Sequence, residues 1–143
     1  MLRILWCLGL LIGNLAFAEA ITIPHASLTP YGNSQNTLTG LATPSLGATQ
    51  SEIWHSSIGV GSETPLHTHE AEEIVILLAG RMQAIVGDKL SRCDAPCTII
   101  LPANESHMLK NIGDVPTNHY LVMPIKSKIL DTQGKEMLLP WRK

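Results

Sequence analysis

From Glu52 onward the chain is a close succession of short β-rich segments. Most are rich in β-branched or aromatic residues, and they are separated by Gly, Pro, Asn or Asp, which favour turns. The segments read EIWHSSIGV, LHTH, EIVILL, MQAIVG, TIILP, HMLKN and HYLVMPI. Their number and spacing predict an all-β sandwich or barrel. The only candidate helix is a weak one in the tail, residues 128–143.

Two imidazoles and a carboxylate fall within seven residues of the stretch GSETPLHTHEAEEIVILLAG, residues 61–80. Side chains on a strand alternate between faces, so His67 and His69 point the same way and their ring nitrogens can converge on one ion. A short polar gap then turns the chain, and Glu73 begins a second strand, which we expect to lie beside the first. This spacing is typical of a metal site.

Two neighbouring residues, Glu72 and Glu73, could supply the carboxylate ligand. Glu72 faces the opposite way from Glu73, because a shift of one residue on a strand swaps faces. We therefore assign Glu73 to the metal and expect Glu72 in solvent or behind a ligand. Gly80 closes the strand, at a turn that commonly needs a positive φ.

A third imidazole, His107, follows in the phrase PANESHMLKN. Residues 98–101 are a β-rich run, residues 102–104 predict a turn, and His107 lies a few residues into the next strand. Asn104 tolerates the left-handed conformation that such a turn can demand. The candidate metal ligands are thus His67, His69, Glu73 and His107. The three remaining histidines are expected to lie at the surface or to be hydrogen-bonded. They are His25, His55 and His119.

These two phrases resemble the two sequence motifs of the cupin family. The first motif is matched at every fixed position, by Gly61, His67, His69, Glu73 and Gly80. The second is matched by Pro102, Asn104, His107 and Asn111, with Asn104 in place of the usual glycine and Pro96 in place of an earlier one. The resemblance implies a double-stranded β-helix, or jelly-roll β-barrel, with one divalent transition metal per chain. Zinc, manganese and iron all suit three imidazoles and a carboxylate, so the metal stays open.

A narrower likeness is to the plant auxin-binding protein family and its small bacterial relatives. It is carried by GSETPLHTHEAEEIV, by an asparagine in the proline turn and by a tryptophan near the C-terminus. In that family the metal takes the carboxylate of an indole acid, and a C-terminal Trp lies over the ring. The likeness implies a ligand pocket walled by Thr64 and Pro65. Val75 stands at the position of an aromatic pocket residue, and Trp141 is matched by its place near the chain end.

Two classes of function are compatible with such a site. The first, which we favour, is an enzyme of the dioxygenase, lyase or isomerase type that acts on a small carboxylate or hydroxylated organic molecule. The second is a non-catalytic protein that captures a small carboxylate through its metal. An octahedral ion with four protein ligands leaves two positions open, which is enough for either. The sequence shows no unmistakable general acid or base, so the enzyme question stays open.

The first 18 residues have the pattern of a secretory signal peptide. Arg3 supplies the positive charge, residues 4–12 are apolar, and Ala16-Phe17-Ala18 is a small-residue cleavage site after which Glu19 begins the mature chain. The apolar run is too short to span a bilayer. The pattern predicts export to the periplasm or the exterior. The domain plan is a signal at 1–18, an extended arm with one or two strands at 19–50, a barrel core at 51–126 and a tail at 127–143.

The charge of the chain limits the classes of partner that it can bind. The chain has 10 basic and 12 acidic side chains, a formal net charge of −2, and no basic patch, so we expect a small-molecule ligand and no nucleic acid. No membrane association is expected after signal cleavage.

Cys93 and Cys97 remain in the mature chain and predict a disulfide closing a small loop. Thiols for metal or redox chemistry are the alternative.

The strand that begins at Glu73 is apolar on both faces. Val75 and Leu77 share the inward face of Glu73, so Ile74, Ile76 and Leu78 point outward. A strand that is apolar on both faces is covered on both. The cover is either the N-terminal arm or a second subunit, and we favour a homodimer.

Overall fold

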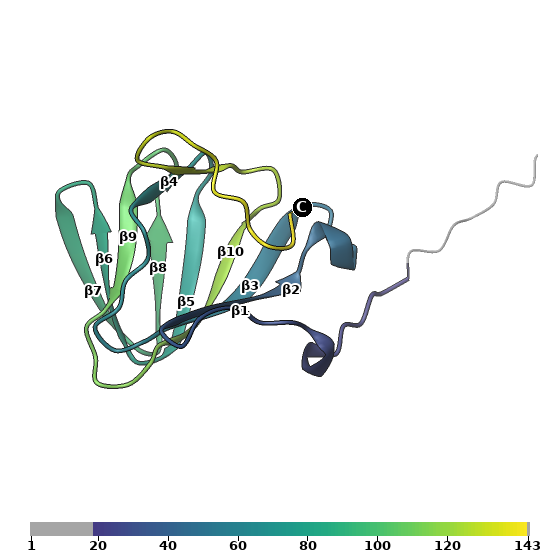
Figure 1. Cartoon of the computed structure of the whole chain (residues 1–143), viewed down its shortest axis with the longest axis horizontal. Coiled ribbons are helices and arrows are strands. Elements are labelled where there is room, and N and C mark those ends of the chain that lie inside the picture. Colours follow the sequence, from purple (N-terminus) through teal and green to yellow (C-terminus); the bar gives the residue numbers. More distant parts are fainter. Residues whose placement is uncertain (1–18, 143) are drawn as a thin grey trace, which may run out of the picture.

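Two antiparallel sheets face each other in the computed structural model, which describes residues 19–142 (Figure 1). The six-stranded sheet contains, in spatial order, β1 (Tyr31–Gly32), β2 (Asn36–Ala42), β3 (Ser51–Ile58), β10 (Asn118–Pro124), β5 (Glu73–Ala79) and β8 (Cys97–Leu101). The five-stranded sheet contains β11 (Ile129–Asp131), β4 (His67–His69), β9 (His107–Asn111), β6 (Arg81–Val86) and β7 (Lys89–Asp94). Two three-residue 3-10 helices, η1 (His25–Ser27) and η2 (Pro44–Leu46), are the only helical elements in this range.

The predicted all-β class is confirmed, and a strand forms within each of the seven β-rich segments. Strand β3 illustrates why these segments form strands. Its residues alternate between buried and more accessible positions, so one face of the strand can pack on the core. Trp54 and Ile58 of β3 enter the core between the sheets together with Leu77 of β5 and Leu109 of β9. The inward side chains of both sheets therefore form one core.

The connection between β4 and β5 differs from the prediction that these strands lie side by side. Strand β4 pairs with β9 and β11, whereas β5 pairs with β10 and β8 in the other sheet. Residues 70–72 carry the chain from one sheet to the other. The crossing matters for the site, because it places Glu73 across from His67 and His69.

The tail is not helical, so the helix considered for residues 128–143 is wrong. Its first part forms β11, which pairs with β4 from Ile129 opposite His69 to Asp131 opposite His67. The Asp131 carboxylate then accepts the N–H groups of Gln133 and Lys135, both at 2.9 Å, and this fixes a turn. Side-chain capture of the backbone competes with helix formation here.

The segment expected as an extended arm contributes β1 and β2, and β2 pairs with β3 along its length. The predicted signal peptide and its cleavage site, residues 1–18, lie outside the described residues. Within residues 19–142 there is no helix of the length and apolar character that a membrane crossing requires.

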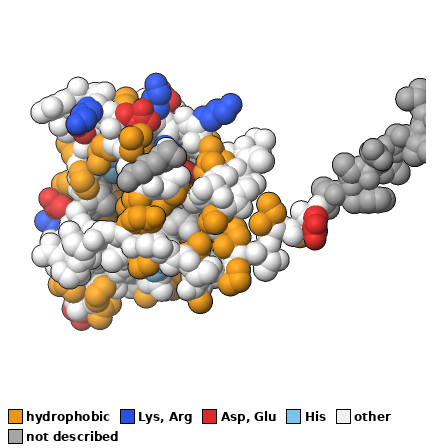
Figure 2. Space-filling model, turned by 45° about the vertical axis from the view of Figure 1, so that its right-hand side comes forward, with side chains coloured by type: hydrophobic (Ala, Val, Ile, Leu, Met, Phe, Trp, Pro, Cys, Tyr) orange, Lys and Arg blue, Asp and Glu red, His pale blue; other side chains and the backbone are white. Residues whose placement is uncertain are grey.

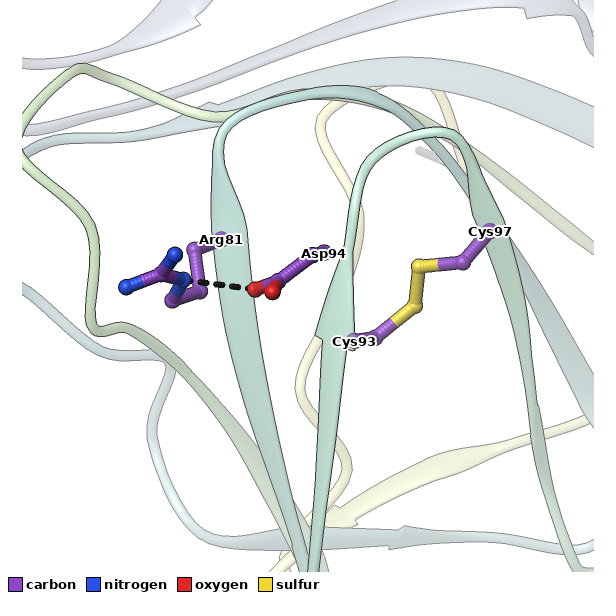
Figure 3. Close-up of a disulfide and its surroundings, with 4 residues drawn as sticks. All are labelled: Arg81, Cys93, Asp94 and Cys97. Atoms are coloured by element: carbon purple, nitrogen blue, oxygen red, sulfur yellow. Dashed lines mark hydrogen bonds and ion pairs between the residues drawn. A yellow bond between two sulfur atoms is a disulfide. The ribbon is translucent and has the colours of Figure 1, made fainter.

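Cys93 at the end of β7 and Cys97 at the start of β8 flank the turn between these strands (Figure 3). The sulfur atoms of Cys93 and Cys97 lie at disulfide distance, and their Cα atoms are 6.1 Å apart. On the neighbouring strand β6, Arg81 Nε donates a hydrogen bond of 2.5 Å to Asp94 Oδ1. Because β7 and β8 belong to different sheets, this turn links the two layers just before the second motif.

Candidate metal centre

Four side chains from three strands converge at one end of the space between the sheets. His67 and His69 come from β4, Glu73 is the first residue of β5, and His107 is the first residue of β9, where it pairs with His67. One potential ligand atom from each lies within 4.8 Å of all the others. The four residues that the sequence predicted as metal ligands thus form one possible metal site.

The second motif is tied to the first by its turn. Asn104 adopts φ 62°, the left-handed conformation that its sequence position predicted. Its N–H donates to the carbonyl of His69 at 2.7 Å. This bond holds the turn that precedes His107 against the strand that carries the other two imidazoles.

Backbone carbonyls orient two of the three rings. His67 Nδ1 lies 2.6 Å from the carbonyl oxygen of Pro65, and His107 Nδ1 lies 2.8 Å from that of Glu105. A carbonyl only accepts, so in both rings Nδ1 carries the hydrogen and Nε2 keeps its lone pair. Metal-binding histidines commonly have such a partner on the other nitrogen.

Two buried nitrogens at the centre have no hydrogen-bond partner among the described residues, His69 Nδ1 and His107 Nε2. They lie 3.6 and 3.7 Å from Glu73 Oε2, and all three side chains are almost completely buried. Buried polar atoms are normally paired, so unpaired atoms that face a carboxylate point to a missing common partner.

The surroundings of the site favour neutral side chains. Burial lowers the pKa of His67, and burial together with the neighbouring His67 and His107 rings lowers the pKa of His69 to about 3. Burial also raises the pKa of Glu73, an effect that His107 opposes. Neutral imidazoles are the form that binds metal, and a cation would stabilise the desolvated carboxylate. The donor set therefore fits one divalent transition ion without selecting among zinc, manganese and iron.

A cavity of about 360 Å³ opens from the site into the space between the sheets. His67, His69 and Glu73 line one part of it, whereas the fully buried His107 lies behind them. The other walls are mostly apolar and include Trp54, Leu109, Leu121, Ile129 and residues 137–140 of the tail. The metal ligands thus form a polar patch in a largely apolar chamber.

The pocket residues implied by the auxin-binding likeness take different places. Thr64 and Pro65 line the cavity, and the Thr64 hydroxyl accepts the Leu109 N–H at 3.0 Å. Val75 is fully buried in the core and does not line the cavity. Trp141 lies outside the cavity lining, with its ring centroid 5.9 Å from that of Trp54.

Residues that the sequence did not single out as part of the site complete it. Ser56 and His119 line the cavity. Asn111, the last residue of the second motif, is buried and donates to the carbonyls of Ile58 and Val115, each at 2.8 Å. In the sequence, only the position of Asn111 in the second motif indicated that it matters. In the structure, its hydrogen bonds hold the end of β9.

The tail is fixed through Glu52, a buried carboxylate of β3 that accepts hydrogen bonds from Trp141 and Arg142.

His119 should make the fold sensitive to acid. Burial, with a smaller effect of His55, lowers the pKa of His119 to about 4. The unfolded chain therefore binds this proton more tightly, and the stabilisation present above about pH 6.5 is lost as the pH falls toward 4. We expect this residue to account for about 3 kcal/mol of that loss. Urea unfolding of wild type and His119→Gln across this range measures it, and parallel pH curves would contradict it.

Residues 54–123 match the family model of the cupin domain. Among curated proteins, auxin-binding protein 1 of Arabidopsis thaliana is 32% identical over 76 residues, which are 47% of this chain and 38% of that protein. Auxin-binding protein 4 of Zea mays is 28% identical over 113 residues, 70% of this chain and 54% of that protein. The chain thus spans only about half the length of these relatives or less.

Solved structures support the fold at low sequence identity. The polyketide cyclase RemF of Streptomyces resistomycificus superposes with a TM-score of 0.68 at 16% identity, covering 87% of this chain and 90% of that one. A variant oxalate decarboxylase of Bacillus subtilis gives 0.69 at 10% identity, covering 76% and 30%. At such identities the likeness concerns the fold alone. The family model, the two-sheet architecture and the ligand motifs agree that residues 54–123 of this chain form a cupin domain.

Proposed function

We propose that this protein captures a small carboxylic acid through a divalent metal ion held by His67, His69, Glu73 and His107. The observation that carries this proposal is the position of three of the four candidate ligands in the wall of a largely apolar cavity. A carboxylate can bind the ion while the rest of the molecule fills the apolar space. The names of the auxin-binding relatives support ligand capture.

The ion would supply a fixed positive charge and Lewis acidity. The chain's own residues orient two of the imidazoles, exclude water with apolar walls and limit ligand size through the 360 Å³ cavity. Apart from the ligands, the titratable side chains lining the cavity are Tyr31 and His119. Among residues 19–142, no carboxylate other than that of Glu73 lines it, and this favours binding over acid–base turnover.

Turnover of the bound acid is the second candidate, as a dioxygenase, lyase or isomerase. It is favoured by the number of protein ligands, because four leave two positions of an octahedral ion open. Product analysis after incubation of the metal-loaded protein with acids that bind it separates the two functions. Recovery of every ligand unchanged, with and without oxygen, would exclude this candidate for those ligands.

Binding is tested with pairs of acids and their primary amides, which share a body and differ in charge. The metal-loaded protein should bind the better acids at least roughly tenfold more tightly than their amides, because only the carboxylate can bind the ion as an anion. The metal-stripped protein should lose this preference. Calorimetry measures both. Equal binding of acids with and without metal would contradict the proposal.

We also propose export from the cytoplasm and assembly as a homodimer. Export is supported by the signal pattern of residues 1–18 and by a cysteine pair at disulfide distance. For the dimer, the outward face of β5 and the edge strand β8 exposes Ile76, Leu78 and Ile100 by 37%, 43% and 61%. The outward positions of these two strands carry no charged side chain. A second copy could cover this face without burying a charge.

Light scattering of wild type and Ile100→Lys tests the dimer. The wild type should have twice the mass of one chain, and the lysine on the edge strand should produce monomers. Leu90→Lys is a matched control, because Leu90 is 63% exposed on β7, at the edge of the other sheet. A monomeric wild type would contradict this part of the proposal.

A further inference from the structure

A second polar cluster lies in the cavity wall formed by β3 and β10. Ser56 of β3 and His119 of β10 are directly opposite each other in the antiparallel register. Both are buried, with 4% and 1% of their surfaces exposed, and both line the cavity. An otherwise apolar wall thus contains two adjacent polar side chains that are not metal ligands.

The hydrogen bonds of this pair are incomplete. His119 Nδ1 lies 3.2 Å from Thr117 Oγ1, and that oxygen also accepts the Ile58 N–H at 2.9 Å. Within residues 19–142, neither His119 Nε2 nor the Ser56 hydroxyl has a hydrogen-bond partner in the protein. Neither atom is among the fully buried atoms that lack a partner, so both are reached from the cavity, and a partner is expected there. The ring and hydroxyl together can donate and accept.

The strand register sets the distance between this pair and the metal ligands. His119 pairs with Leu77 of β5, and Glu73 lies four residues earlier on the same strand. At about 3.3 Å per residue, this is roughly 13 Å of strand. Between the two levels, Trp54 and Leu121 form another opposed pair that lines the cavity. The cavity wall is therefore polar at the metal, apolar in the middle and polar again at Ser56 and His119.

We propose that Ser56 and His119 recognise a second polar group on the bound acid, at the end away from the carboxylate. The ligand class is then an acid with an apolar body and a distal hydroxyl or carbonyl group. A hydroxyl can donate to one side chain and accept from the other, whereas a carbonyl accepts. This inference rests on the proposed function, because the metal must first hold the carboxylate.

The experiment uses arylalkanoic acids of increasing chain length, each paired with its para-hydroxy counterpart, and the metal-loaded protein. At the length that spans the cavity, wild type should bind the hydroxylated acid roughly tenfold more tightly, the effect of about one buried hydrogen bond. In Ser56→Ala and in His119→Leu the ratio of the two affinities should fall to about two or less. Ser56→Ala is a small truncation and keeps the test valid if His119→Leu fails to fold.

Leu38→Val is the matched control, because Leu38 pairs with Ser56 and lines the cavity without a polar group. It should change both affinities by similar factors and keep their ratio. If wild type binds plain acids through the metal but prefers no hydroxylated member, or keeps its preference in both variants, this inference is wrong and the proposed function stands. If no acid binds the metal-loaded wild type, both are wrong.

Discussion

Replacing His69 and His107 together by alanine should lower the affinity for a divalent transition metal by more than about a hundredfold. Changes outside a ligand set already cost up to that factor, and here two ligands are lost. The two rings come from different strands, and each turns an unpaired nitrogen toward Glu73. Elemental analysis of the dialysed protein, after loading with zinc, manganese or iron, gives the metal content per chain.

The matched control replaces two histidines outside the site, His25 and His55. His25 is exposed, and His55 Nε2 pairs with Asn118 at 2.7 Å, away from the cavity lining. This double variant should keep its metal. Circular dichroism checks that both double variants retain the β fold. A folded His69→Ala/His107→Ala protein that still holds about one ion per chain would overturn the site assignment.

Glu73→Gln should have opposite effects on metal affinity and on the stability of the metal-free fold. Burial raises the pKa of Glu73, so the folded chain binds this proton more tightly than the unfolded chain does. In the metal-free protein, stability is therefore lost as the pH rises above the usual carboxyl pKa. The glutamine variant has no such charge and should be more stable than metal-free wild type at pH 7, yet bind metal more weakly. Urea unfolding with and without metal measures both effects, and a metal-free variant less stable than wild type would contradict the argument.

The grouping of His67, His69 and Glu73 could be predicted because its information is local. His67 and His69 are two residues apart on one strand, and Glu73 follows within one short connection. A period of two assigns faces without knowledge of the partners of a strand. The same reasoning separated Glu73, which is buried, from Glu72, which is exposed. The left-handed Asn104 was also predictable, because few residues other than glycine accept that conformation.

The partners of each strand could not be predicted in this way. Strand β7 has a polar, mostly exposed sequence and exists because all six of its residues pair with β6. Strand β11 is three residues long and forms against β4. The placement of β4 and β5 in different sheets depends on pairings with β9 and β10, which are distant in sequence. Tertiary pairing, not local preference, decides these elements.

The remaining cavity residues were missed for the same reason. A lone histidine such as His119 carries no motif, and only the register of β10 against β3 places it opposite Ser56 inside the cavity. Glu52 and Arg142 are 90 residues apart, and nothing in either local sequence predicts their ion pair. Long-range pairs of this kind become visible only when the strands are assembled.

Glu52→Ala should destabilise the protein by about 3 kcal/mol and release the tail from the barrel. The Glu52 carboxylate is completely buried and accepts Trp141 Nε1–H at 3.2 Å and the Arg142 guanidinium. Arg142 also donates to the carbonyl of Ser127 at 2.6 Å. Loss of one partner of a buried ion pair leaves a charge that must stay unpaired or return to water, at a cost of about 3–5 kcal/mol. Because the Arg142 side chain is already partly exposed, it can turn toward water once Glu52 is lost, so the lower end is expected.

Detachment should also affect the cavity, because residues 137–140 form part of its wall. Figure 2, in which the right-hand side of Figure 1 comes forward, shows apolar side chains near the middle of the molecule. Hydrogen exchange should show faster exchange of the Met137 N–H, which bonds the Ile129 carbonyl at 2.8 Å in the intact protein. Acid affinity should fall in the same variant, since an open wall no longer excludes water from the apolar part of the ligand.

Two controls identify the buried ion pair as the cause. Glu63→Ala removes an exposed partner of Lys110, 3.2 Å away, and should cost less than about 1 kcal/mol. Glu52→Leu/Arg142→Leu removes both buried charges and should recover most of the loss in urea unfolding, because no unpaired charge remains. If Glu52→Ala is no more destabilising than Glu63→Ala and leaves exchange at Met137 unchanged, apolar packing alone holds the tail. The packing of Trp141 against Trp54 would then be a contact that holds the tail in place.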